Sequence, residues 1–255
     1  MAQPVDNSNR AAGTTPPPVF CQHIAVPAYF DPRAGTTGGN LWSTMLASAP
    51  ALGIIIANPN DGPGAAQDPG YVKAIQSARS KGIKVAGYVH THYGAPDAAK
   101  RANQDIDAWN SFYGVTDIFL DTMPTAKSFI ALYQGYNERI KKRAGITILN
   151  PGTTFPEEWV AQNAGDIFVT FEDGANAHSS ATFPSWMTSG KYQPGRFMHL
   201  VYGVAAGSLN TVLNRTRALK VGHVYITSDD LPNPWDSLAS YWATEVAAIN
   251  KGCGR

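Results

Sequence analysis

The feature that most constrains the fold of this chain is a regular alternation of short apolar runs with amphipathic runs, repeated eight times. The apolar runs are rich in β-branched and aromatic residues, which is typical of strands buried on both faces of a parallel sheet. The runs between them have helical spacing, as in Val72, Ile75 and Ala78. We predict strands over residues 23–30, 52–57, 84–91, 117–121, 146–149, 166–172, 197–202 and 223–227. We predict helices over residues 41–49, 69–81, 97–113, 125–144, 156–163, 184–190, 208–219 and 235–250.

Eight strand–helix units in 255 residues fit a single closed (β/α)8 barrel, a TIM barrel, over residues 20–255. Residues 1–19 form a polar, proline-rich tract that we place outside the barrel. An open doubly wound sheet is the alternative fold. It is disfavoured because no glycine-rich phosphate-binding turn follows the first strand.

Composition narrows the possible partners. Twenty Lys and Arg balance nineteen Asp and Glu, so the basic excess typical of nucleic-acid binding is missing and we expect no nucleic-acid partner. No apolar run is long enough to span a membrane, and we expect a monomer without a membrane partner. The polar start resembles a mature amino terminus behind an added Met. Cys21 and Cys253 flank the predicted barrel, so we expect a disulfide and a secreted protein, with two free thiols as the alternative.

Two of the predicted strands end in a carboxylate. The run 117–121 ends at Asp121 and the run 166–172 ends at Glu172. Alternation places Phe119 with Asp121 on one face of its strand, and Thr170 with Glu172 on one face of the other. Active sites of such barrels lie at the carboxyl ends of the strands, and paired carboxylates are the working groups of glycoside hydrolysis. The alternative is that either acid caps a helix or ties a loop.

Other polar residues fall at the same predicted strand ends. We expect them to contact substrate at the barrel mouth; they are Tyr29, Asp31, Asn58, Tyr88, His90, Asn150, Tyr202 and Asp229. His90 and His92 have a spacing that can hold a metal, but we favour His90 as a hydroxyl partner and expect neither metal nor cofactor. Asp229 could instead cap its loop. Trp235 and Trp186 could be sugar platforms or core residues.

Several motifs, in order and in register, resemble the spherulin 4 family, which is glycoside hydrolase family 135 and is related to the endo-α-1,4-polygalactosaminidases. They are Val26-Pro27-Ala28-Tyr29-Phe30, Ile56-Ala57-Asn58-Pro59 with Gly62-Pro63-Gly64, Gly87-Tyr88-Val89-His90-Thr91 with Tyr93, and Ile118-Phe119-Leu120-Asp121. The similarity extends from about residue 26 to residue 172 and is looser beyond. It implies a secreted barrel without a cofactor that cleaves α-1,4-linked galactosamine or N-acetylgalactosamine polymers, such as the galactosaminogalactan of biofilms.

The resemblance also implies roles for individual residues. Asp121 and Glu172 match the family's two acids, and we assign Asp121 as nucleophile or stabiliser and Glu172 as general acid. Tyr93 joins the expected substrate contacts. Thr122, also counted among those contacts, stands where the family commonly has Glu, so substrate preference could differ although the acid pair is complete.

Two alternatives to a hydrolase stay open. A metal-dependent deacetylase acting on the same sugars would need His90, His92 and Asp121 to converge on one ion. A barrel that binds polysaccharide without cutting it is the other, and the presence of Thr122 keeps it open.

Overall fold

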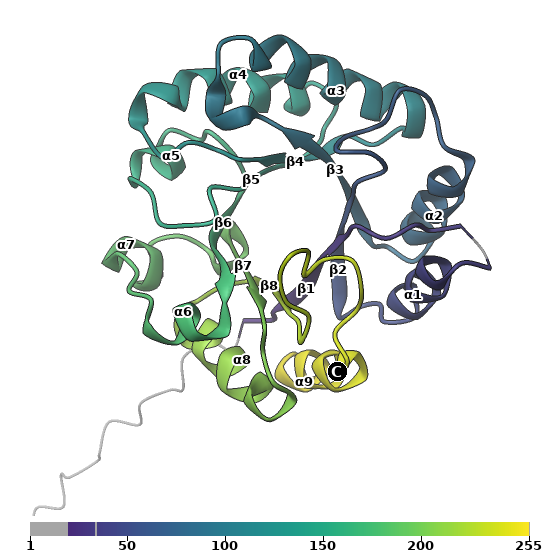
Figure 1. Ribbon diagram of the computed structural model, residues 1–255. Helices are drawn as coiled ribbons and strands as arrows, with labels where there is room; N and C mark the ends of the chain where they lie inside the picture. Colours follow the sequence, from purple (N-terminus) through teal and green to yellow (C-terminus); the bar gives the residue numbers. More distant parts are fainter. Residues whose placement is uncertain (1–19, 34, 255) are drawn as a thin grey trace, which may run out of the picture.

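Eight parallel strands close into a barrel in the order in which they occur in the chain, as predicted (Figure 1). The computed structural model describes residues 20–33 and 35–254, so the predicted tract over residues 1–19 lies outside the described residues. The strands are β1 (His23–Ala28), β2 (Leu52–Ala57), β3 (Lys84–His90), β4 (Asp117–Asp121), β5 (Thr147–Leu149), β6 (Ile167–Gly174), β7 (Phe197–Tyr202) and β8 (His223–Ile226). Nearly all their residues are buried, as the continuous apolar runs indicated.

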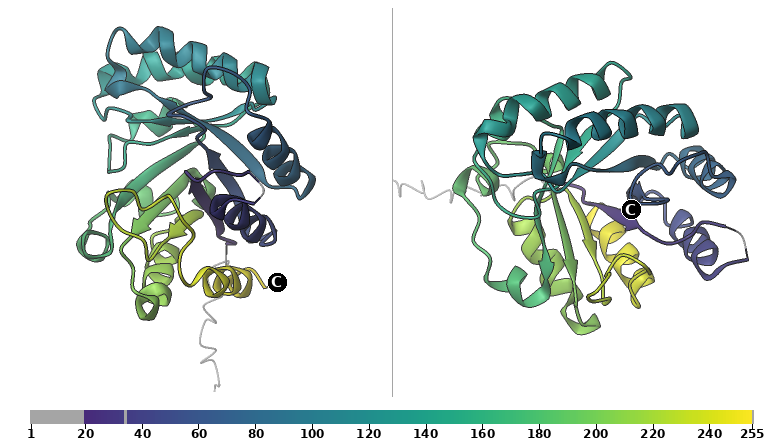
Figure 2. Two further views of the ribbon diagram at one scale, coloured as in Figure 1. Left: turned by 45° about the vertical axis from the view of Figure 1, so that its right-hand side comes forward. Right: turned by 45° about the horizontal axis from the view of Figure 1, so that its top comes forward.

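Helices surround the barrel and remain outside the strands in all three views (Figures 1 and 2). They are α1 (Thr37–Leu46), α2 (Pro69–Ser80), α3 (Ala98–Tyr113), α4 (Ile130–Lys141), α5 (Glu158–Ala161), α6 (Ala175–Ser180), α7 (Ser185–Thr188), α8 (Leu209–Ala218) and α9 (Trp242–Gly252). Short 3₁₀ turns accompany them in the described part of the chain, namely η1 (His92–Gly94), η2 (Lys127–Phe129), η3 (Pro194–Arg196) and η4 (Ala206–Ser208).

Local sequence explains where several helices begin and end. Asp68 caps α2, because its carboxylate accepts hydrogen bonds from the backbone N–H groups of Gly70 and Tyr71, and Pro69 occupies the first helical position. Helix α3 ends at Gly114, which adopts a left-handed conformation with φ 61°.

A close contact between α3 and β3 positions the strand that leads to the mouth. The indole of Trp109 lies directly on Gly87, where an added Cβ would come within 2.3 Å of the ring. Its Nε1 donates a hydrogen bond of 2.7 Å to the carbonyl oxygen of Tyr88. Only glycine allows the indole to approach the backbone so closely, and the contact fixes the position of Tyr88 along the barrel axis.

The prediction that Thr170 and Glu172 share a face is wrong. A bulge interrupts the pairing of β6 with β7 between Val169 and Phe171. An extra residue in one strand resets its alternation. Thr170 consequently lies with Phe183 and other residues of the helix-covered side, while Glu172 still reaches the mouth.

The main departures from the predicted helices are two shortened segments and one helix that was not predicted. The segment 125–144 begins with η2, so that α4 starts only at Ile130. Helix α6 follows β6 directly and was not predicted. The segment 235–250 is helical only from Trp242, because residues 227–241 form a long loop whose Trp235 is buried at the mouth.

The two ends of the barrel are joined covalently. Cys21, just before β1, and Cys253, just after α9, form a disulfide, which confirms the predicted bridge. The link closes a loop of 232 residues in sequence and restricts the unfolded chain. None of the helices that the structure describes is long and apolar enough to cross a membrane.

Candidate active site

The two predicted acids lie close together and share one hydrogen-bond donor. Asn150 follows β5, which lies between β4 and β6, and its side chain is buried between the two acids. Its Nδ2 donates to Asp121 Oδ1 at 2.7 Å and to Glu172 Oε2 at 2.6 Å. Because both oxygens bond to one nitrogen, these two oxygens are no more than about 5.3 Å apart, a spacing that suits two carboxylates acting on one glycosidic bond.

The other oxygen of each acid is also hydrogen-bonded. Tyr88, which projects from β3, donates its hydroxyl to Asp121 Oδ2 at 2.7 Å. Trp235, from the loop between β8 and α9, donates its indole N–H to Glu172 Oε1 at 3.2 Å. Residues from three different segments thereby fix the orientation of the pair, as a preorganised site requires.

The surroundings of Glu172 change its affinity for a proton. Burial and, next, the charge of Asp121 raise the pKa of Glu172 to about 7, although the hydrogen bonds from Asn150 and Trp235 oppose the shift. A carboxyl group with this pKa holds a proton near neutral pH and can deliver it to a leaving oxygen. The geometry therefore suits Glu172 to the part of a general acid.

Two tyrosines line the wall beside the pair. The rings of Tyr29 and Tyr88 meet edge to face, with centroids 5.8 Å apart. Burial first, and then the charges of Asp121 and Glu172, raise the pKa of Tyr29. Burial and the neighbouring Asp121 do the same for the pKa of Tyr88. Both phenols therefore stay neutral and available as hydrogen-bond donors to a sugar or to an acid.

Further predicted contacts lie at the end of β3 and in the turn that follows it. The ring of His90 stacks beside that of Tyr88, and the ring of His92 lies 3.9 Å from that of His90. Tyr93, the next residue in the chain, is highly exposed. Thr122, across from it, turns its hydroxyl to the carbonyl oxygen of Asp121, at 2.7 Å.

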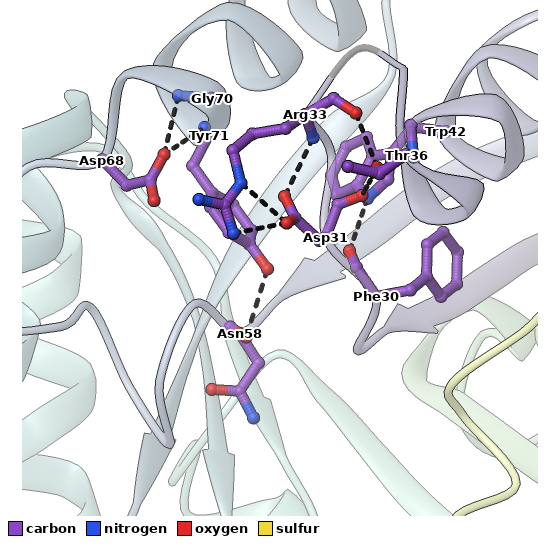
Figure 3. A network of polar contacts seen from close by, with 10 residues as sticks. Phe30, Asp31, Arg33, Thr36, Trp42, Asn58, Asp68, Gly70 and Tyr71 are labelled. Carbon is purple, nitrogen blue, oxygen red and sulfur yellow. Dashed lines mark hydrogen bonds and ion pairs between the residues drawn. The ribbon is translucent and has the colours of Figure 1, made fainter.

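Asp31 and Asn58 have partners in the loops and helices around them (Figure 3). The Asp31 carboxylate accepts from the side chain and the backbone N–H of Arg33, and this hydrogen bonding holds the pKa of Asp31 below its ordinary value. The Asn58 side chain accepts from the backbone N–H of Gly62, while its carbonyl oxygen accepts from the Tyr71 hydroxyl. Both residues thus shape the loops after β1 and β2, and their contact with substrate stays a prediction.

Tyr202 and Asp229 lie on the side of Trp235. The Tyr202 hydroxyl donates to Asp173 at 3.0 Å, and its ring meets that of Trp235 edge to face. Asp229 accepts a hydrogen bond of 2.6 Å from the Ser237 hydroxyl, so this carboxylate ties the loop 227–241, whether or not it also meets substrate.

Trp235 is the contact that sequence reasoning missed. The sequence left it between a sugar platform and the core, whereas the structure shows it bonded to Glu172, 63 residues away. No local pattern marks such a partner. Trp186, by contrast, packs against Phe155 and Phe197 in the helix layer.

The residues required by the deacetylase alternative do not form a metal site. Within residues 20–33 and 35–254, no group of three or more His, Cys, Asp or Glu side chains is arranged to hold an ion. Both oxygens of Asp121 already accept hydrogen bonds from Asn150 and Tyr88.

Comparison with known proteins decides the family. The profile of Spherulin4, described as spherulation-specific family 4, matches residues 23–249. The chain belongs to this family. Spherulin-4 of Physarum polycephalum is 31% identical over 242 residues, covering 89% of this chain and 70% of that protein. The resemblance inferred from the motifs is thereby confirmed.

Solved structures agree on the fold. The structure of Aspergillus clavatus Sph3 in complex with GalNAc superposes with a TM-score of 0.76 at 17% identity, covering 90% of this chain and 97% of Sph3. A GH18 chitinase from Pseudoalteromonas aurantia superposes with a TM-score of 0.52 at 14% identity, covering 82% and 94% of the two chains. The spherulin 4 chain therefore has a barrel of the kind found in glycoside hydrolases.

Proposed function

We propose that this protein is a secreted glycoside hydrolase that cleaves α-1,4-linked galactosamine and N-acetylgalactosamine polymers of the galactosaminogalactan type. The observation that carries the proposal is the pair of Asp121 and Glu172, both bonded to the amide of Asn150, together with the rise of the pKa of Glu172 to about 7. Membership of the spherulin 4 family and the GalNAc bound to Sph3 support the choice of sugar. The disulfide supports secretion, because such bonds persist in oxidising compartments.

The proposed reaction uses the two acids in turn. Glu172 gives its proton to the glycosidic oxygen while the bond from that oxygen to the anomeric carbon breaks. Asp121 attacks the anomeric carbon from the other side and forms a covalent ester. Glu172, now ionised, then takes a proton from water, whose oxygen displaces Asp121. The close spacing of the acids favours this double displacement over direct attack by water, for which a wider gap is needed.

Charge at the mouth favours a partly deacetylated, cationic polymer. Besides Glu172, which is protonated in its role as acid, the carboxylates of Asp121, Asp173, Asp229 and Asp230 lie at or beside the mouth, and clustered charges of one sign concentrate oppositely charged substrates. Asp31 adds less to this field, because Arg33 pairs with it at 2.5 Å.

Purified protein incubated with α-1,4-galactosaminan tests the proposal. We expect oligosaccharides, detected by mass spectrometry, from the wild type and none from Asp121→Asn or Glu172→Gln. Thermal melting of each variant controls for folding. If the two variants formed as much product as the wild type, the assignment of the active site would be refuted. If the wild type bound the polymer but formed no product, the protein would be a non-catalytic barrel. Release of acetate that a chelator abolishes would identify a deacetylase instead.

A further inference from the structure

Tyr93 is held in solvent by an unusually constrained backbone. Its side chain is 66% exposed, and only Leu231, at 65%, is comparable among the large hydrophobic residues that the structure describes. Tyr93 and the preceding His92 both adopt left-handed conformations, with φ of 54° and 48°. Such conformations are unfavourable for residues other than glycine and persist only where the surroundings impose them.

The surroundings here impose this conformation from several directions. The backbone N–H of Tyr93 donates to the carbonyl oxygen of Thr122 at 2.9 Å. Thr91 is fully buried, and its hydroxyl donates to the carbonyl oxygen of Asp121. Gly94 fits against Phe129 so closely that a Cβ would come within 2.6 Å of that ring. The loop is therefore a rigid frame anchored to the end of β4, where Asp121 lies.

Burial does not explain why an aromatic residue is held at this position, because the exposed ring of Tyr93 gains little stabilisation from packing although its loop is rigid and bonded beside a catalytic carboxylate. The ring of Tyr88, which bonds Asp121, packs beside that of His90, and the ring of His90 packs beside that of His92. Tyr93 is the next residue in the chain. Because the backbone of Tyr93 is bonded to Thr122, the residue after Asp121, the loop that carries the ring lies on the Asp121 side of the mouth. Aromatic rings offer a flat apolar face with a polar edge, which suits the apolar face of a pyranose with its hydroxyl groups.

We propose that Tyr93 is a stacking platform for a hexosamine unit beyond the two sugars of the scissile bond, on the Asp121 side of the mouth. This inference rests on the proposed hydrolase function and adds to it that the enzyme binds an extended stretch of polymer. A ring fixed before binding loses little conformational freedom when a sugar stacks on it, so the backbone constraint serves affinity.

The test compares Tyr93→Gly, which removes the ring and suits the left-handed backbone, with Tyr93→Phe, which keeps the ring. We expect Tyr93→Gly to lower kcat/KM on long polymer by about 10-fold, mainly through KM, and to leave kcat/KM on a disaccharide glycoside within about twofold. Tyr93→Phe should stay near the wild type on both substrates. Leu231→Ala, the matched change at the other exposed apolar side chain, should leave polymer cleavage unchanged.

Stability distinguishes a platform from a structural role. Since glycine relieves the left-handed strain and little packing is lost, Tyr93→Gly should melt about 2 °C higher than the wild type. A lower melting temperature, equal losses on long and short substrates, or a loss in Leu231→Ala as large as that in Tyr93→Gly would overturn the platform. A wild type that cleaves no polymer refutes the hydrolase itself, whereas a cleaving wild type matched by Tyr93→Gly refutes the platform alone.

Discussion

Replacing Trp235 with Phe should move the pH dependence of hydrolysis. The indole N–H donates to Glu172 Oε1 at 3.2 Å and stabilises the ionised form of that acid. Phe keeps most of the buried ring but removes the donor. Ionised Glu172 then loses a partner, so its pKa should rise above the value of about 7 that it has in the wild type.

The size of the shift follows from the energy of the lost contact. A hydrogen bond to a charged group contributes about 1.5–3 kcal/mol, and one pKa unit corresponds to about 1.4 kcal/mol. Water at the mouth replaces part of the contact, so we expect a rise of about one unit. Because Glu172 must be protonated to act, activity falls with rising pH, and the alkaline limb of kcat/KM should move from near pH 7 to near pH 8.

The assay is a pH profile of kcat/KM on one soluble substrate, together with thermal melting of each protein. Trp186→Phe is the matched control, since it makes the same change in the helix layer, against Phe155, and should leave the limb in place. An unmoved limb in Trp235→Phe, or one displaced toward acid, would refute the assignment of Glu172 as the general acid controlled by this hydrogen bond.

Three further results are expected. The first products, followed by NMR, should retain the anomeric configuration, because the shared donor Asn150 keeps Asp121 and Glu172 close enough for double displacement. Inversion of the configuration would contradict this. Gly87→Ala should destabilise by about 3 kcal/mol in denaturant titration because its Cβ would meet an indole at 2.3 Å, whereas Gly135→Ala, with nothing within 4 Å, should be neutral or stabilising. Burial raises the pKa of Glu245 to about 8. Between about pH 4.5 and pH 8 the folded protein therefore keeps a proton that the unfolded chain releases, so the free energy of unfolding should fall as the pH rises. Glu245→Gln should weaken this pH dependence of stability, and an unchanged dependence in the variant would contradict the prediction.

The barrel was predictable because its signal is local and repeated. Each strand is buried on both faces, so the sequence reads as short apolar runs, and the eight runs coincide closely with β1 to β8. The position of Asp121 follows in the same way, because a polar residue that ends an apolar run lies at the mouth. Cys21 and Cys253 were also predictable, since a closed barrel brings its two ends together.

What escaped prediction depends on contacts between distant segments. The bulge at Thr170 reflects how β6 pairs with β7, which alternation within one strand cannot reveal. Trp235 looked like the start of a helix, but tertiary contacts at the mouth outweigh local helical spacing. The partners of Asp31 and Asn58 likewise arise from loop geometry rather than from residue type.

The loop over residues 227–241 completes the closure of the barrel between its last strand, β8, and its first strand, β1. Strands β1 and β8 pair only through His23 and Ile24, and nearer the mouth Tyr29 donates its backbone N–H to the carbonyl oxygen of Trp235 instead. The loop that extends the contact between the first and last strands is therefore also the one whose Trp235 lowers the pKa of Glu172 by a hydrogen bond. Closure of the barrel and the pKa of Glu172 therefore depend on the same loop. A change that weakens the contact between Tyr29 and Trp235 should alter the pH dependence of hydrolysis before the barrel unfolds.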